Sequence, residues 1–126
     1  MSELQDIQNK EDIKQLVNAF YSKATVDDVI GHFFTEVSQL DLPSHLPIMY
    51  SFWDSILFYG NEYKGNPMGK HVEMSKKSPL QQKHFDRWLS LWKSTVSELF
   101  TGVKADEAIA KADQIGKLMA FKVKAE

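Results

Sequence analysis

Two histidines and a tryptophan lie in a stretch whose residue types could bind a metal ion. His71 follows Pro67 and Gly69, which end one helix and permit only a short helical turn before it. His84 and Trp88 stand four residues apart at the start of the next helix. A neutral imidazole can give a lone pair to a metal while its other ring nitrogen is hydrogen-bonded. Spacing alone fits solvated surface histidines as well, so both interpretations stay open at this point.

Composition narrows the function classes. The chain has 126 residues, 43% of them hydrophobic and 25% charged, which is typical of one globular domain. The net charge of −2 gives no electrostatic basis for binding nucleic acid or an anionic membrane. With no cysteine, disulfides, thiol nucleophiles and zinc-thiolate sites are excluded. The N-terminus is polar and no apolar run reaches the ~20 residues of a membrane span, so we expect a cytoplasmic protein.

The first helix is predicted from a clear apolar stripe. Asn9 is a suitable N-cap, and Tyr21 lies on the stripe, so its hydroxyl needs a partner in the interior or in water. The stripe consists of Ile13, Leu16, Val17, Phe20, Tyr21 and Ala24. Thr25 and Asp28 then resemble a capping box for a short second helix that carries Val29, Ile30, Phe33 and Phe34.

The next helix is apolar almost all the way round. We expect Ser44 as its N-cap, Pro47 in its first turn and its end at Tyr59. A helix with so many aromatic side chains needs apolar neighbours on both sides. It is therefore either the centre of a tight bundle or packed between protein and a flat apolar cofactor, and periodicity does not decide between the two.

Two long helices complete the prediction. The first begins at Ser78-Pro79-Leu80-Gln81, with serine as the cap, and stops near Gly102. The second spans about residues 105–123, with the small residues Ala112 and Gly116 allowing close approach of another group. We find no strand pattern or repeat, so the expectation is one all-α domain over residues 1–126, with residues 1–8 as a flexible tail.

Two motifs carry a family resemblance. The pattern Tyr-x-Gly-x-Pro-x-x-x-His at residues 63–71, followed by Phe-x-x-Trp-Leu-x-Leu-Trp at residues 85–92, resembles the truncated (2/2) haemoglobins of group III. The resemblance extends from about Asp12 to Met119. It implies a truncated globin fold, a two-over-two helical sandwich around haem b (iron protoporphyrin IX).

The resemblance also implies roles for single residues. His71 matches the proximal ligand of the haem iron, and His84 is the rival candidate on the following helix. The distal pocket, where a gas ligand binds, is implied to contain Tyr21, His45, Met49 and Trp88. A tyrosine O–H and an indole N–H in such a pocket are donors that decide how long a ligand stays.

Further residues are expected to contact the haem. Phe34 matches the phenylalanine that packs on the porphyrin, with Phe33 as the competing candidate one residue earlier. Tyr63 and Lys70 are the candidates for binding the propionates, with Lys64 and Lys76 behind them. The full set of cofactor-binding residues is Phe33, Phe34, Phe52, Trp53, Tyr63, Met68, Lys70, Phe85 and Met119.

Function is expected from the same resemblance. It implies binding of O2, and of NO and CO, with slow release that suits chemistry such as NO detoxification, in a dioxygenase-like or peroxidase-like manner, better than transport. A reductase would then be a partner, and the chain would be a monomer or weak dimer. Two alternatives stay open: gas sensing or storage without turnover, and a haem-free helical interaction domain.

Overall fold

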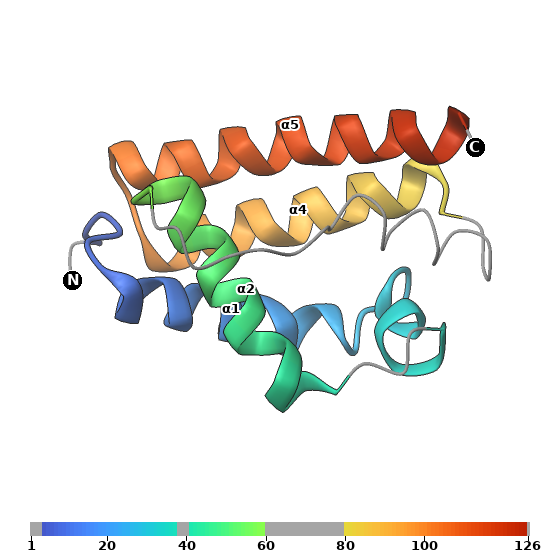
Figure 1. The fold of residues 1–126 in the computed structure, drawn as a ribbon, viewed down its shortest axis with the longest axis horizontal. Coiled ribbons are helices and arrows are strands. Elements are labelled where there is room, and N and C mark those ends of the chain that lie inside the picture. Colours follow the sequence, from blue (N-terminus) through green and yellow to red (C-terminus); the bar gives the residue numbers. More distant parts are fainter. Residues whose placement is uncertain (1–3, 38–40, 60–79, 126) are drawn as a thin grey trace.

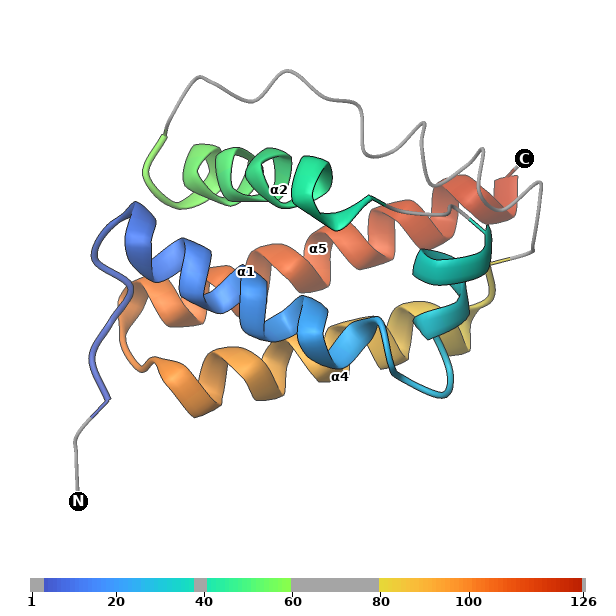
Figure 2. The same cartoon turned by 90° about the horizontal axis from the view of Figure 1, so that it is seen from below.

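In a computed structural model of the protein, the residues that the structure describes form two pairs of packed helices (Figure 1). The structure describes residues 4–37, 41–59 and 80–125. Helix α1 (Lys10–Ala24) packs on α2 (Leu42–Leu57), and α4 (Gln82–Leu99) packs on α5 (Val103–Ala125). The pairs meet through contacts of α1 with α4 and of α2 with α5. Figure 2 shows α1 between α2 and α4, with α5 behind. None of the described helices is long and apolar enough to span a membrane.

Helix α1 confirms the sequence prediction closely. The Asn9 side chain accepts a hydrogen bond from the backbone N–H of Asp12 at 3.0 Å, which is the expected N-cap. All six residues of the predicted stripe are buried. Because the stripe faces both α2 and α4, this one helix joins the two pairs.

The turn after α1 differs from the expected capping box. Thr25 donates its hydroxyl to the carbonyl of Tyr21 at 2.8 Å and so closes the end of α1. Asp27 caps the turn in place of Asp28, since its carboxylate accepts the N–H groups of Val29 and Ile30 at 3.0 and 3.1 Å. The short element that follows is η1 (Phe33–Val37), a single π-helical turn.

Helix α2 begins earlier than the sequence analysis expected. Asp41 is the N-cap, and its carboxylate accepts the Ser44 hydroxyl at 2.7 Å, so Ser44 lies inside the first turn. Pro43 takes the first-turn position where a missing N–H costs little, and Pro47 falls inside the helix. The helix ends at Leu57, two residues before the expected end, and Tyr59 has a left-handed backbone with φ of 59°.

Helix α4 begins at Gln82 with Gln81 as its cap. The predicted serine cap was therefore wrong as the start of this helix, and Ser78 and Pro79 lie outside the described residues. His84 occupies the third position of α4, and its Nδ1 accepts the backbone N–H of Gln81 at 2.8 Å. Histidine thus performs the part that Glu or Gln plays in a capping box.

The segment before α1 is tied to the far end of the chain, although we expected a flexible tail. Ile7 is 2% exposed and belongs to the core. The Asp6 carboxylate accepts the N–H groups of Lys104 and Ala105 at 2.9 and 2.8 Å, which caps the start of α5. Gly102 has a φ of +140°, and a Cβ there would lie 2.5 Å from the Asp6 side chain. Glycine at position 102 is therefore what lets this cap form.

Candidate functional site

A largely apolar cavity lies between the helix pairs. Its empty volume is about 910 Å³, part of which is open to solvent, and no described lining residue is Asp, Glu, Lys or Arg. The walls come from α1, the turn and η1, α2, α4 and α5. The lining residues are Phe20, Tyr21, Ile30, Phe33, Phe34, Met49, Phe52, Trp53, Leu80, His84, Phe85, Trp88, Trp92, Ile115 and Met119. Such a cavity fits a mostly apolar ligand held by a few polar contacts.

Tyr21 and His45 form the main polar contact at one wall. The Tyr21 hydroxyl lies 2.9 Å from Nε2 of His45, with the rings edge to face at 5.3 Å between centroids. Tyr21 is 8% exposed, and burial raises the pKa of its phenol. The phenol is therefore neutral at physiological pH and keeps its proton. Helices α1 and α2 bring together two residues that are 24 positions apart.

Trp88 forms another wall because of a glycine on α5. A Cβ added at Gly116 would lie 3.4 Å from Cζ3 of Trp88, so the absence of a side chain makes room for the indole. The neighbouring Trp92 donates its Nε1–H to the carbonyl of Ala108 at 3.1 Å and stacks on Trp53 at 4.4 Å. Among the residues that the structure describes, the indole N–H of Trp88 has no hydrogen-bond acceptor. Trp92 is thus a structural residue, whereas Trp88 retains a donor for a ligand.

His84 lines the cavity but is already engaged. It is 9% exposed, its ring lies edge to face on Phe33 at 4.8 Å, and its Nδ1 accepts the Gln81 N–H. A neutral imidazole that accepts at Nδ1 carries its proton on Nε2. In this arrangement His84 has no lone pair to offer a metal. Burial lowers the pKa of His84, and the charges of Lys83 and His32 lower it further, so the neutral ring is favoured.

An ion pair holds two walls of the cavity together. Arg87 Nη2 lies 2.6 Å from Oδ1 of Asp27, and Arg87 Nε donates to the same oxygen at 2.8 Å. The Arg87 hydrogen bond is the main cause that lowers the pKa of Asp27, and the N–H groups of Ile30 and Val29 add to it. The pair joins the turn that carries Ile30 to the helix that carries Trp88 and so fixes the spacing between these walls.

The structure brings most of the sequence-predicted site residues to this cavity. Tyr21, Phe33, Phe34, Met49, Phe52, Trp53, Phe85, Trp88 and Met119 line it, and both Phe33 and Phe34 do so. His45 contacts Tyr21 without being a lining residue itself. His71, Tyr63, Met68 and Lys70 lie outside the described residues, as do Lys64 and Lys76.

Other lining residues were not predicted as part of the site. Phe20 was predicted on the apolar stripe of the first helix, so the pattern found it as a core residue. Trp92 belongs to the motif at residues 85–92, and Ile115 lies on the last predicted helix. Ile30 lies on the predicted short helix, and Leu80 precedes α4. The Asp27–Arg87 pair left no signal, because the two residues are 60 positions apart and form no motif.

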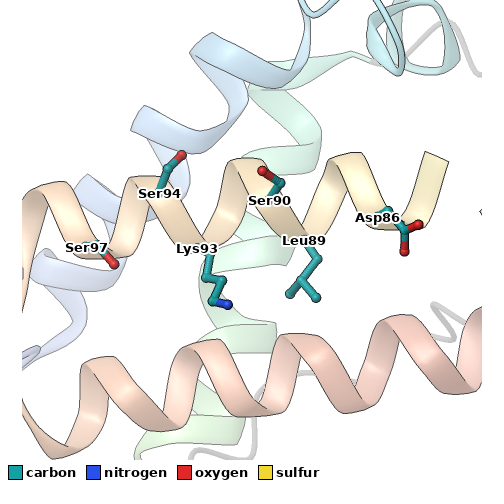
Figure 3. A pocket seen from close by; sticks show the side chains of 6 residues that line it. All are labelled: Asp86, Leu89, Ser90, Lys93, Ser94 and Ser97. Atoms are coloured by element: carbon teal, nitrogen blue, oxygen red, sulfur yellow. The ribbon is translucent and has the colours of Figure 1, made fainter. Parts of the chain in front are cut away.

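A second hollow lies on the surface of α4 (Figure 3). Its lining residues are Asp86, Leu89, Ser90, Lys93, Ser94 and Ser97, which all come from this one helix. All of them except Leu89 are exposed. We regard it as a surface depression, because its described lining residues all lie on a single helix.

The two-over-two arrangement of helices is the truncated globin fold. In a comparison with solved structures, the chain matches the crystal structure of group III truncated haemoglobin from Campylobacter jejuni with a TM-score of 0.84 and 22% identity, covering 96% of this chain and 95% of that one. Among curated sequences it is 26% identical over 110 residues to the group 3 truncated haemoglobin ctb of Campylobacter jejuni subsp. jejuni serotype O:2, covering 85% of this chain and 84% of the relative. No protein-family model matches the sequence. The resemblance to group III truncated haemoglobins is thereby confirmed.

The sequence analysis predicted a haem cofactor, and the lining of the cavity can be tested for its fit. The walls are apolar and aromatic, as the faces of a porphyrin require, and the missing Cβ of Gly116 leaves the Trp88 ring its place. Polar lining groups are few, and the buried Tyr21 phenol is neutral. The described residues therefore fit a flat, largely apolar group.

Proposed function

We propose that the cavity binds haem b and that the protein acts on O2 and NO there, in an NO-detoxifying reaction. The observation that supports this most is the buried pair Tyr21–His45 beside an otherwise apolar cavity, with the indole N–H of Trp88 as a further donor. Haem held there would supply an iron that binds a diatomic ligand. Haem-free use of the fold is not favoured by the comparisons.

We assign the proximal position to His71. Its rival His84 holds the Gln81 N–H at Nδ1 and so lacks a lone pair for iron. The family motif at residues 63–71 supports His71 independently. Haem titration of the two variants separates the candidates: His71→Ala should lose stable haem binding, whereas His84→Gln should keep one haem per chain. The opposite pattern would overturn the assignment.

The distal residues are proposed to retain the gas ligand. Tyr21 holds its proton at every physiological pH, so it can donate its hydroxyl hydrogen to a ligand that gains negative charge. His45 lies within hydrogen-bond distance of the same hydroxyl and orients it. Trp88 adds a second donor from α4, and Met49 contributes apolar surface on α2. Two donors in a largely apolar cavity favour slow release, which suits turnover better than transport.

The reaction is tested in two steps. Haem added to the purified chain should give a stoichiometric Soret band that shifts sharply when the reduced protein is exposed to CO. The reduced protein, equilibrated with O2 and then mixed with NO, should form nitrate faster than free haem does. Equal rates would remove the detoxification proposal while leaving haem binding intact. Repeated turnover needs an electron donor, so a reductase is the partner that this function requires.

A further inference from the structure

The start of α4 carries several walls of the cavity and depends on one titratable residue. Leu80, His84, Phe85 and Trp88 all line the cavity and lie within or just before the first two turns of this helix. The hydrogen bond from the Gln81 N–H to His84 Nδ1, at 2.8 Å, satisfies a backbone donor at the point where the chain enters the helix. The side chain that makes this bond is nine-tenths buried.

We propose that His84 is a positioning residue for the cavity, acting as a helix cap only while its ring is neutral, and that protonation of the ring loosens the wall carrying Phe85 and Trp88. His84 belongs to the cavity for which haem binding is proposed, so its effect on haem rests on that proposed function, but the cap itself forms without haem. We assign no contact between His84 and the iron.

The chemistry of the ring makes the cap sensitive to pH. In the capped state Nε2 carries the hydrogen and Nδ1 holds the only lone pair. An added proton must therefore go to Nδ1, where it displaces the Gln81 N–H. The resulting cation lies at the N-terminus of α4, where the helix dipole disfavours positive charge. Loss of the hydrogen bond and charge repulsion therefore both weaken the start of α4 when His84 is protonated.

The surrounding charges add to this effect. Lys83 on the same helix and His32 from the turn before η1 are the described residues whose charges act on His84, and both disfavour its cation. The His32 ring lies 6.3 Å from that of His84. The Asp27–Arg87 ion pair lies one turn further along α4.

The lowered pKa of His84 decides how the strength of the cap changes with pH. Because the folded state holds the neutral ring more strongly than the unfolded chain, whose histidine pKa is 6.5, the cap is complete above that value. It is lost as the pH falls below 6.5 and through the lower pKa of the folded state. The cavity wall should therefore be tighter at neutral pH than in acid.

Backbone amide exchange of the full chain tests the cap. Between about pH 7.5 and about pH 5 the protection factor of the Gln81 amide in the wild type should fall about tenfold, the effect of losing one helix cap. His84→Gln places a non-titrating acceptor at the same helical position and should keep that protection at both pH values. The cap of α1 is the internal control, since Asn9 accepts the Asp12 N–H through an amide that does not titrate.

Haem affinity gives the second readout. The wild type should lose about tenfold more affinity than His84→Gln over the same pH interval, because His71 is common to both proteins. Equal losses in the two proteins, or pH-independent protection of the wild-type Gln81 amide, would overturn the proposal. His84→Ala should lose protection at both pH values, but the comparison with His84→Gln decides the question even if the alanine variant does not fold. If the purified protein bound no haem, the proposed function would be wrong, but the amide-exchange test of the His84 cap would still be valid.

Discussion

The hydroxyl oxygen of Tyr21 lies 2.9 Å from Nε2 of His45, and this contact joins α1 to α2 at the wall of the cavity. Because the phenol is buried and keeps its proton, the contact is a hydrogen bond of the neutral phenol and involves no phenolate. Its two members can exchange roles as donor and acceptor with the tautomer of His45. A ligand entering the cavity thus meets a polar group whose hydrogen can be redirected without a change in net charge.

Removing the Tyr21 hydroxyl should speed ligand release. Tyr21→Phe keeps the ring, which packs edge to face on Phe34 at 5.6 Å, and deletes only the donor. We expect haem to stay bound and O2 to leave about tenfold faster, the equivalent of one hydrogen bond. Stopped-flow displacement of O2 by CO measures this rate. Tyr50→Phe is the matched control, since the Tyr50 hydroxyl donates to Asn18 on the protein surface. Similar rates in all three proteins would remove Tyr21 from the ligand pocket.

Trp88 and Trp92 should respond differently to the same change. Trp88→Phe deletes an indole N–H that has no acceptor among the described residues, so the expected effect is faster O2 release by several-fold with a small change in stability. Trp92 is 1% exposed and its N–H is bonded to Ala108, so Trp92→Phe should mainly lower the free energy of unfolding, by about 1–3 kcal/mol. Urea unfolding and ligand displacement, measured on both variants, separate the two roles. A large stability loss in Trp88→Phe would contradict this division.

Gly102 should be intolerant of any side chain. Its φ of +140° is unfavourable for alanine, and a Cβ would lie 2.5 Å from the Asp6 side chain. Gly102→Ala is therefore expected to cost about 2 kcal/mol or more of unfolding free energy. The cost should shrink in a chain that already carries Asp6→Gly, because the Asp6 atoms that would clash with the new Cβ belong to the side chain that also forms the cap. Fully additive effects in this double-mutant cycle would show that the two residues do not act through one contact.

Acid should destabilise the protein partly through Asp27. The Arg87 hydrogen bond, with the two backbone N–H groups, holds the folded-state pKa of Asp27 below the ordinary value of 3.8. The stability from this group is therefore present above 3.8 and is lost as the pH falls through the lower folded-state pKa. Asp27→Asn should be less stable than the wild type near neutral pH, and its urea midpoint should fall less between about pH 5 and about pH 3. Parallel midpoint curves for the two proteins would contradict this.

The sequence was sufficient to predict structure where the apolar pattern is local and repeated. The stripe of α1 and the small residues of α5 follow from helical periodicity, and the structure confirms both. Helix starts were harder, because several residues can serve as caps. The N-cap of α2 is Asp41, three residues before the predicted Ser44, and Pro47 lies inside the helix.

The site was predictable in its aromatic walls but not in its polar detail. Family resemblance indicated Tyr21, His45 and Trp88, which lie at the cavity or beside it. No sequence pattern indicated that Nδ1 of His84 would accept a hydrogen bond from a backbone N–H, since histidine is an unusual capping residue. The Asp27–Arg87 contact depends on how two distant segments pack, which is decided by tertiary structure and not by spacing.

The placement of the tryptophans has a practical consequence. The chain contains three, and Trp53, Trp88 and Trp92 all line the cavity. Its entire indole emission therefore arises at the wall of one cavity, with no remote fluorophore to leave a constant background. A strongly absorbing molecule bound there should quench this emission almost completely, so intrinsic fluorescence alone can follow occupancy, stoichiometry and the rate of filling in unlabelled protein.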